Sequence, residues 1–435
     1  AVGRVLLRFP LNVDVEDVFV GDGRQDTLVA AETIRVNVGL GRILKGVVSV
    51  KELGVRQATV RYRDTVSGML LDARVGELCL QVREVDLKRR VADVSLLALE
   101  RGRVRFEPGK ASGEADTTGG GAPLDWQLRV EEIALSQVDY EMGGAMRAGV
   151  GNAAIRNGGI DLGRQTVAIG GVSLEEGYCE LLTGEEEPAA NVVADTAETL
   201  PWTVSVGRVA LADSRFYMRP LGVSPDTVAF PEVIDVRGLS LEIDSVYNRG
   251  TEVDARIRHI ALREAGGLEV KDLEGNVTLG EKEMKVDGLS VKTLNSQLSV
   301  DVAVGAGLAD FEEDSPLRVD LQGKFGGGDL APFVQGVDEE VGKLLRESSF
   351  ALTARTEGSL NQLDLPELRL EVDSTLVLAM RGNVSSLTKG ENMEGQVEMN
   401  LRVDDGRVAD VFTGEGITVP DSLRLNVLAA LKEQE

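Results

Sequence analysis

The segment Ile133-Ala-Leu-Ser-Gln-Val-Asp-Tyr140 carries the pattern that decides the fold. The pattern is an apolar residue, any residue, an apolar residue, two polar residues, a mostly small residue, any residue and an apolar residue. Four other segments follow it: Leu53-Gly-Val-Arg-Gln-Ala-Thr-Val60, Leu97-Ala-Leu-Glu-Arg-Gly-Arg-Val104, Val172-Ser-Leu-Glu-Glu-Gly-Tyr-Cys179 and Val209-Ala-Leu-Ala-Asp-Ser-Arg-Phe216. The first residues of the five copies are 44, 36, 39 and 37 positions apart, which is typical of a supersecondary unit that is repeated and stacked. The polar pair and the small residue predict a tight turn or bulge between two strands.

Around these copies the dominant periodicity of the chain is two. Apolar and polar residues alternate in Ile34-x-Val36-x-Val38, Leu78-x-Leu80-x-Val82, Leu239-x-Leu241-x-Ile243, Leu298-x-Val300-x-Val302 and Leu368-x-Leu370-x-Val372. Alternation places one set of side chains on one face of a strand and the other set in water. The sequence therefore predicts an all-β protein made of short, half-buried strands.

The composition excludes several classes of function. Lys and Arg number 47 against 72 Asp and Glu, giving a net charge of −25 and a pI near 4.6. This charge argues against nucleic acid as a partner, because phosphate binding requires clustered cations. Apolar residues make up 43% of the chain, too many for a disordered acidic protein, while aromatic residues make up only 4%.

Three regions are expected along the 435 residues. Residues 1–325 are predicted to be stacked β-repeat units of roughly 36–44 residues that form a groove, and 349–435 to be further strands of the same kind. Between them, 326–348 contains an amphipathic helix, since the apolar residues of 329–345 recur at helical spacing. Polar segments at 107–123, 184–201 and 220–231 are predicted to be loops.

Residues for catalysis or metal binding are scarce, and we predict that the protein is not an enzyme and holds no cofactor or metal. The single histidine, His259, lies on the polar side of an alternating strand, where a solvated role is expected. Acidic clusters such as Glu185-Glu-Glu187 fall in predicted loops. The aspartates near Gly23 do not have calcium-loop spacing, and Gly41-Arg-Ile-Leu-Lys-Gly46 lacks the lysine of a phosphate-binding loop.

The two cysteines, Cys79 and Cys179, lie in strand-like runs 100 positions apart. They permit one disulfide, but such residues are more often small packing residues. No apolar run is long enough to span a bilayer or to act as a secretory signal. Because the chain opens without Met and enters patterned sequence at once, we expect a fragment of a longer protein.

A one-sided sheet built from repeats leaves a continuous apolar face that something must cover. A second sheet, closure into a filled solenoid, or apolar ligands such as acyl chains would each do so. The candidate groove residues are the apolar anchors of the repeats: Leu53, Val55, Leu97, Leu99, Ile133, Leu135, Val172, Leu174, Val209 and Leu211.

Several stretches resemble the TamB-like proteins of the AsmA-like group, in the Bacteroidetes-type form. The resemblance rests on Asp22-Gly-Arg-Gln-Asp-Thr-Leu-Val-Ala-Ala31, the run from Ile34 to Leu53, the units led by Trp126 and Trp202, the run from Leu289 to Leu298, and the helical pattern at 329–345. It implies an elongated, folded-over β-sheet groove, sometimes called a β-taco. It also implies a periplasmic protein anchored in the inner membrane, with a TamA- or BamA-like outer-membrane barrel as partner through a C-terminal region.

Three functions remain open at this point. The first is a conduit whose groove shields phospholipid acyl chains between the inner and outer membranes. The second is an assembly or translocation factor whose strand edges receive outer-membrane protein strands. The third is a passive structural β-repeat protein that binds no lipid.

Overall fold

A computed structural model of the chain divides into two compact units, Ala1–Ser240 and Leu241–Glu435. The structure describes residues 2–8, 12–21, 27–38, 50–64, 68–86, 88–109, 125–183, 201–221, 233–330, 342–343, 346–373, 375–386, 394–406, 419–420 and 422–431. Each unit is considered by itself below.

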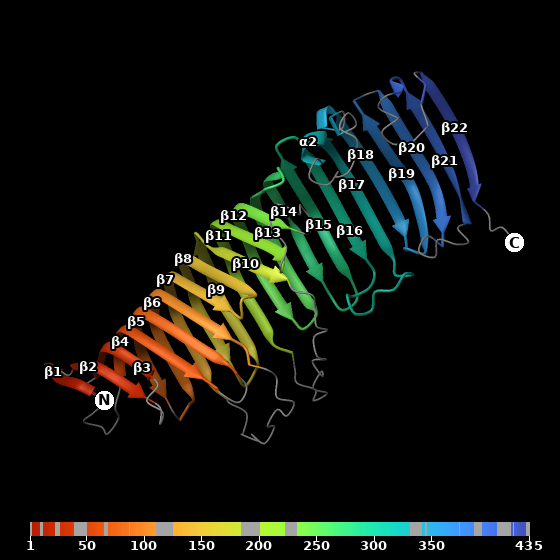
Figure 1. The fold of residues 1–435 in the computed structure, drawn as a ribbon. Coiled ribbons are helices and arrows are strands. Elements are labelled where there is room, and N and C mark those ends of the chain that lie inside the picture. Colours follow the sequence, from red (N-terminus) through yellow and green to blue (C-terminus); the bar gives the residue numbers. More distant parts are fainter. Residues whose placement is uncertain are drawn as a thin grey trace. The chain divides into compact units, whose positions relative to one another are not determined.

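The first unit is a row of long strands (Figure 1). They are β1 (Val2–Arg8), β2 (Asn12–Gly21), β3 (Thr27–Val38), β4 (Val50–Arg63), β5 (Leu70–Asp86), β6 (Val91–Glu107), β7 (Gln127–Met142), β8 (Met146–Asp161), β9 (Thr166–Glu175), β10 (Tyr178–Thr183) and β11 (Thr203–Pro220). The sequence of β12 (Ile234–Arg249) crosses the boundary between the units.

The second unit continues with strands of eight to thirteen residues. They are β13 (Glu252–Glu264), β14 (Glu269–Leu279), β15 (Met284–Thr293), β16 (Gln297–Val304), β17 (Leu317–Gly326), β18 (Ser349–Gly358), β19 (Gln362–Val372), β20 (Leu376–Ser385), β21 (Glu394–Val403) and β22 (Leu423–Leu431). A short helix, α2 (Gly327–Leu330), follows β17. The prediction of an all-β fold built from repeated strands is confirmed.

The strands of the first unit pair with their sequence neighbours, with one irregularity. Pairing is antiparallel from β1 to β6, parallel between β6 and β7, and antiparallel from β7 to β9. Strand β11 then pairs in parallel with both β9 and β10, and β10 also pairs with β8. Strands β9 and β10 therefore occupy one position in the row, between β8 and β11.

The second unit is simpler, because β13 to β22 form an unbroken antiparallel series. It also holds a small closed core. Phe350, Val372, Leu376 and Val403 are buried together, and Val419 packs against them.

The repeat motif lies inside single strands in four of its five copies, rather than between two strands as predicted. Only the copy at 172–179 falls between strands, at the break from β9 to β10. In all five copies the fifth residue has a positive φ: Gln57 47°, Arg101 52°, Gln137 54°, Glu176 53° and Asp213 46°. A left-handed residue inside a strand bends it and shifts the alternation of side chains by one position, as in a β-bulge.

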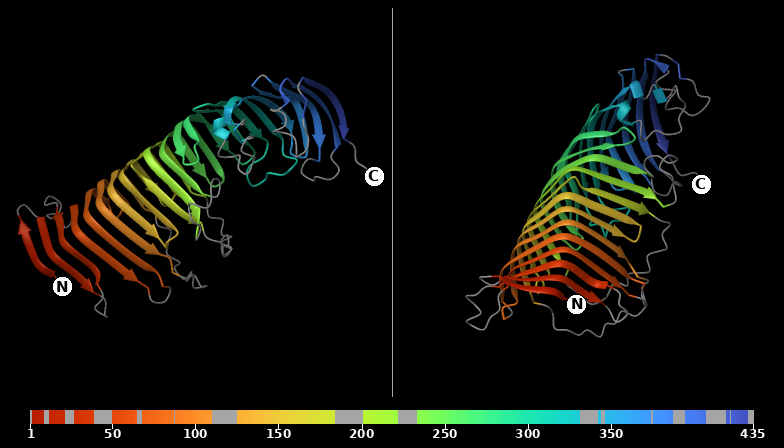
Figure 2. Two further views of the ribbon diagram at one scale, coloured as in Figure 1. Left: turned by 45° about the horizontal axis from the view of Figure 1, so that its top comes forward. Right: turned by 60° about the vertical axis from the view of Figure 1, so that its left-hand side comes forward.

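These bends line up from strand to strand and form what we call the crease. The pairing skips these positions while the register continues on both sides, and it places Gln57 opposite Gly76, Gly76 opposite Arg101, and Arg101 beside Gln137. Figure 2 shows the strands of the first unit bending at a common place. The crease consists of Gly3, Asp17, Glu32, Gln57, Gly76, Arg101, Gln137, Gly151, Glu176 and Asp213.

Three glycines of the crease, Gly3, Gly76 and Gly151, lie opposite left-handed residues, where there is no space for a side chain. A Cβ atom on Gly76 would lie 2.9 Å from the Cβ of Arg101, and one on Gly151 would lie 2.9 Å from the Cβ of Glu176. Real Cβ atoms essentially never approach so closely. The glycines therefore allow neighbouring strands to bend together.

The predicted helix at 329–345 falls mostly outside the described residues, and α2 covers only its start. The predicted loops at 107–123, 184–201 and 220–231 also lie largely outside them. The first two of these connections precede β7 and β11, the strands with parallel pairing, which requires a crossover connection.

Candidate functional site

The ten predicted groove residues fall into two rows that run across the strands of the first unit. Directly paired residues point to the same face of a sheet, so each row is one strip of aliphatic surface. The first row is Leu7, Val13, Val36, Leu53, Leu80, Leu97, Ile133, Ile155, Val172 and Val209. The second row is Val5, Val15, Ile34, Val55, Leu78, Leu99, Leu135, Ala153, Leu174 and Leu211.

These aliphatic rows are not enclosed. All ten predicted residues are half-buried, and at the β1 end Val5 and Leu7 are 59% and 76% exposed. In the described part of the first unit, the buried apolar residues outside glycine are Ala31 and Ala58. Side chains inside a filled core would be almost completely buried. The rows therefore form an apolar surface that the described residues leave partly open.

Beyond the crease, the sixth and eighth residues of each motif face the same side as the first and third. The shift of alternation at the left-handed fifth residue explains this spacing. In β7, Leu135, Val138 and Tyr140 all line one concavity, although they are not evenly spaced by two. The motif is therefore the sequence of a bent strand whose concave side is apolar.

We call this concavity the crease pocket; its volume is about 400 Å³. It brings together three of the predicted groove residues, Leu135, Leu174 and Leu211. The other lining residues are Val138, Tyr140, Ala148, Gly149, Val150, Gly177, Tyr178, Cys179, Ser214, Arg215, Phe216 and Leu239. The remaining seven predicted residues, Leu53, Val55, Leu97, Leu99, Ile133, Val172 and Val209, lie in the aliphatic rows outside it.

Small residues form the floor where the two sides of the bend converge. A Cβ on Gly177 would lie 2.2 Å from Cδ2 of Leu174, and one on Gly102 would lie 3.2 Å from Cδ2 of Leu99. Both glycines are buried, as is Ser214, whose hydroxyl donates to the carbonyl of Ala212 at 3.2 Å. In three copies of the motif the leucine at the third position is thus accompanied by a small residue at the sixth, namely Gly102, Gly177 or Ser214.

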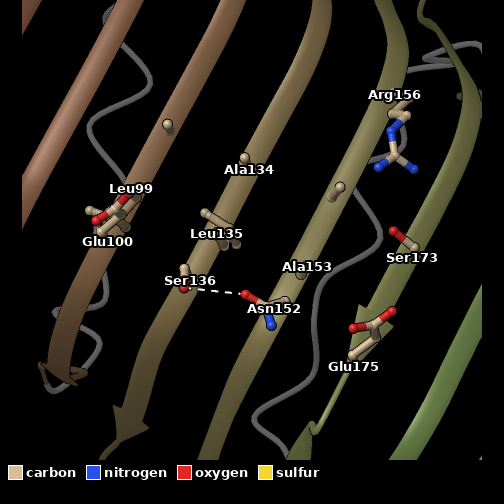
Figure 3. Close-up of a pocket in the computed structure, with 12 residues that line it drawn as sticks. Leu99, Glu100, Ala134, Leu135, Ser136, Asn152, Ala153, Arg156, Ser173 and Glu175 are labelled. Atoms are coloured by element: carbon tan, nitrogen blue, oxygen red, sulfur yellow. Dashed lines mark hydrogen bonds between the residues drawn. The ribbon is translucent and has the colours of Figure 1, made fainter.

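The opposite face of the same strands is polar. A shallow hollow of about 320 Å³ lies there. Figure 3 shows its polar lining residues, Glu100, Ser136, Asn152, Arg156 and Glu175, and the backbone positions of Leu99 and Leu135, which also line it. The Ser136 hydroxyl donates to Oδ1 of Asn152 at 3.2 Å. Alternation along each strand separates this face from the aliphatic rows.

An ion pair with a buried carboxylate, that of Asp14, also lies on the polar face, near the start of the chain. Asp14 is between Val13 and Val15, so its carboxylate points away from the aliphatic rows, where Arg35 Nε donates to it at 2.8 Å. This hydrogen bond, with the nearby charges of Arg35 and Arg8, outweighs burial and lowers the pKa of Asp14. Charge is therefore concentrated away from the apolar surface.

The two cysteines occupy opposite faces. Cys79 lies between Leu78 and Leu80 of the aliphatic rows and so points to the polar face, whereas Cys179 lines the crease pocket. Both are free thiols, and burial raises the pKa of each.

The other residues considered for chemistry do not gather into a site among the described residues. His259 Nδ1 lies 2.8 Å from Oδ1 of Asp272, a contact between strands β13 and β14. No group of three His, Cys, Asp or Glu that could hold a metal occurs in the described ranges. The 41–46 segment, Gly23 and the 185–187 cluster lie outside those ranges.

Sequence reasoning missed the half of the apolar surface that lies beyond the crease. Tyr140, Cys179 and Phe216 are the eighth residues of their motif copies, and all three line the crease pocket. The motif does contain an apolar residue at its eighth position, but strict alternation would place its third and eighth residues on opposite faces. The left-handed fifth residue, which resolves this, has no fixed amino-acid type.

The chain matches no family model, no curated protein and no solved structure. No helix in the part of the chain that the structure describes is long and apolar enough to cross a membrane.

Proposed function

We propose that the protein is a conduit that shields phospholipid acyl chains on the aliphatic rows of its first unit while the headgroups stay in water. The observation that carries this proposal is the register of the two rows. Ten strand positions in succession present aliphatic side chains on one face, with no ionic side chain among them; those on β1 are exposed and the other nine positions are half-buried.

The energetics favour hydrocarbon as the material that covers this surface. Each CH₂ group removed from water contributes about 0.8 kcal/mol. A groove that covers one side of a chain of some 16 carbons thus contributes about 6 kcal/mol before the entropic costs of binding. A uniform aliphatic surface offers no polar anchor, so a bound chain is free to slide along it.

The resemblance to TamB-like proteins supports the same proposal from the sequence. On the basis of that resemblance we propose that the conduit lies in the periplasm, between an inner-membrane anchor and a TamA- or BamA-like barrel. Since no residue needs to react with lipid, the proposal includes no enzymatic step, no cofactor and no nucleic acid.

The test compares two substitutions on adjacent residues of β7. Leu135→Glu places a charge in the second aliphatic row, whereas Ala134→Glu places it on the polar face. We expect Leu135→Glu to reduce transfer of fluorescent phosphatidylethanolamine between vesicles at least tenfold, because a carboxylate facing hydrocarbon is strongly unfavourable. Ala134→Glu should transfer at the unmodified rate.

Circular dichroism and native mass spectrometry with lipid extraction complete this test. Both variants should fold, and the unmodified chain purified without detergent should carry phospholipid. A lipid-free chain, or equal transfer by both variants, would contradict the conduit.

A second candidate, an assembly factor for outer-membrane proteins, is favoured by the edge strands. Within the described residues, β1 pairs only with β2 and β22 only with β21, so each offers an open edge for strand addition. Photo-crosslinkers in β1 and β22 that capture a nascent barrel protein and no lipid would favour this role over the conduit. A chain that captures neither would be a passive structural protein.

A further inference from the structure

The crease pocket differs from the rest of the apolar surface because it has walls on both sides of a bend. Leu135, Leu174 and Leu211 supply one side, and Tyr140 and Phe216 supply the other. The small floor residues Gly177 and Ser214 lie between them, both buried. Elsewhere the aliphatic rows are a continuous strip, whereas here the surface is hollowed.

The volume of the pocket limits what it can hold. A cavity of about 150 Å³ accommodates benzene, which has six carbons. In proportion, a hollow of about 400 Å³ accommodates on the order of 16 carbons. That is the size of one acyl chain, not of the paired chains of a whole phospholipid.

Two of the polar side chains at the pocket, Arg215 and Tyr178, are engaged with other protein groups. Arg215, the ionic residue among the described lining residues, donates from Nε to Asp235 at 3.1 Å. The Tyr178 hydroxyl donates to Asp139 at 3.1 Å. With no free charge to bind a headgroup, the pocket is complementary to uncharged hydrocarbon.

We infer that the crease pocket is a discrete binding site for a single acyl chain within the otherwise continuous groove. We call this site the seat. This inference rests on the proposed function and adds to it a stoichiometry and a position. A diacyl lipid would place one chain in the seat and the other on the neighbouring aliphatic rows.

The two native cysteines provide the test, because Cys179 lines the seat and Cys79 lies on the polar face. Delipidated Cys79→Ser and Cys179→Ser variants each retain one thiol, which is alkylated with N-ethylmaleimide. One equivalent of 16:0 lysophosphatidylcholine, below its micellar concentration, should slow alkylation of Cys179 at least tenfold and leave Cys79 unchanged.

The same alkylation experiment with palmitate, a free fatty acid, tests whether the bound acyl chain comes from a fatty acid or from a phospholipid. Protection of Cys179 by both probes would support a seat that recognises the chain alone. Protection by the lysophospholipid only would support a seat filled from phospholipid. Protection that needs several equivalents, or that affects both thiols equally, would overturn the inference.

A pair of substitutions distinguishes failure of the seat from failure of the conduit. Ala148→Phe fills the pocket from β8, and Ala134→Phe makes the same change on the polar face of β7. We expect Ala148→Phe alone to lower the number of acyl chains retained, measured by native mass spectrometry, by one. Suppose that the unmodified chain binds lipid, that neither variant changes the number of retained acyl chains, and that Cys179 is not protected. The inference of a seat would then be wrong, while the proposed conduit function would stand. If no lipid binds, both fail.

Discussion

The two units of the molecule use the same alternation of apolar and polar residues but differ in what covers the apolar face. In the second unit, Phe350, Val372, Leu376 and Val403 are buried against one another and against Val419 from a connecting segment. In the first unit, the equivalent aliphatic rows stay half-buried. Alternation therefore specifies that a strand has an apolar face, and in the second unit a residue outside the strands, Val419, helps to cover it.

Truncation of one apolar residue in each unit should give the largest contrast. Phe350→Ala leaves a cavity in a closed core and should lower the free energy of unfolding of the second unit by about 3–5 kcal/mol. Leu135→Ala removes a half-buried side chain and should cost the first unit only about 1 kcal/mol. Hydrogen exchange of β18–β20 and of β7–β8 measures the two effects separately.

Similar losses for the two variants would break this comparison. They would mean that the aliphatic rows of the first unit are covered by protein, and the filled-solenoid alternative would replace the groove.

A smaller effect is expected at the crease of the first unit. Gly76→Ala places a Cβ 2.9 Å from that of Arg101 and should cost about 1–3 kcal/mol. Gly54→Ala, on the neighbouring strand, meets nothing closer than the Cβ of Arg35 at 3.8 Å and should change stability by less than about 0.5 kcal/mol. Urea unfolding followed by the fluorescence of Trp126 and Trp202, the two tryptophans of the chain, measures both. Equal costs would show that the crease does not depend on the absence of a side chain at Gly76.

The smallest effect concerns acid stability, for which we compare one buried aspartate from each unit, Asp14 and Asp329. The pKa of Asp14 is lowered chiefly by its hydrogen bond from Arg35. At Asp329 burial acts to raise the pKa, but hydrogen bonds from Ser296, Thr293 and Asn295 outweigh it and leave the pKa lowered.

Both folded pKa values lie below the ordinary value of 3.8, so the stabilisation is complete above that pH and is lost as the pH falls through the folded value. Asp14→Asn should make the free energy of unfolding of the first unit less dependent on pH in acid, and Asp329→Asn should do the same for the second unit. Hydrogen exchange between pH 5 and pH 3 measures both effects. An unchanged pH profile in either variant would contradict the role of that carboxylate.

Much of the strand content and one side of the candidate site were predictable from local pattern. Alternation located the strands, and the repeat motif selected ten residues that the pairing register aligns in two rows. Cross-strand neighbours of the rows, such as Leu78 and Leu80 on β5, were visible only as an alternating run. Their assignment to the same surface needed the register, which depends on contacts distant in sequence.

The remaining features could not be predicted because they depend on non-local structure. Nothing in the motif distinguishes the parallel pairing of β6 with β7 from the antiparallel pairing of β7 with β8. The residues with positive φ in the crease are Gln, Arg, Glu and Asp, and of these types only Asp is enriched in that conformation. The burial of Phe350 and Val372 likewise depends on which segment packs over them.

The alignment of the crease separates two dimensions of the first unit. Its cross-section is set by the bend at the crease, where left-handed residues of some strands lie beside residues such as Gly76 and Gly151 of their neighbours. Its length depends only on how many such strands are paired side by side. Duplicating a hairpin that carries the motif, such as β4 with β5, would therefore lengthen the apolar channel without widening it.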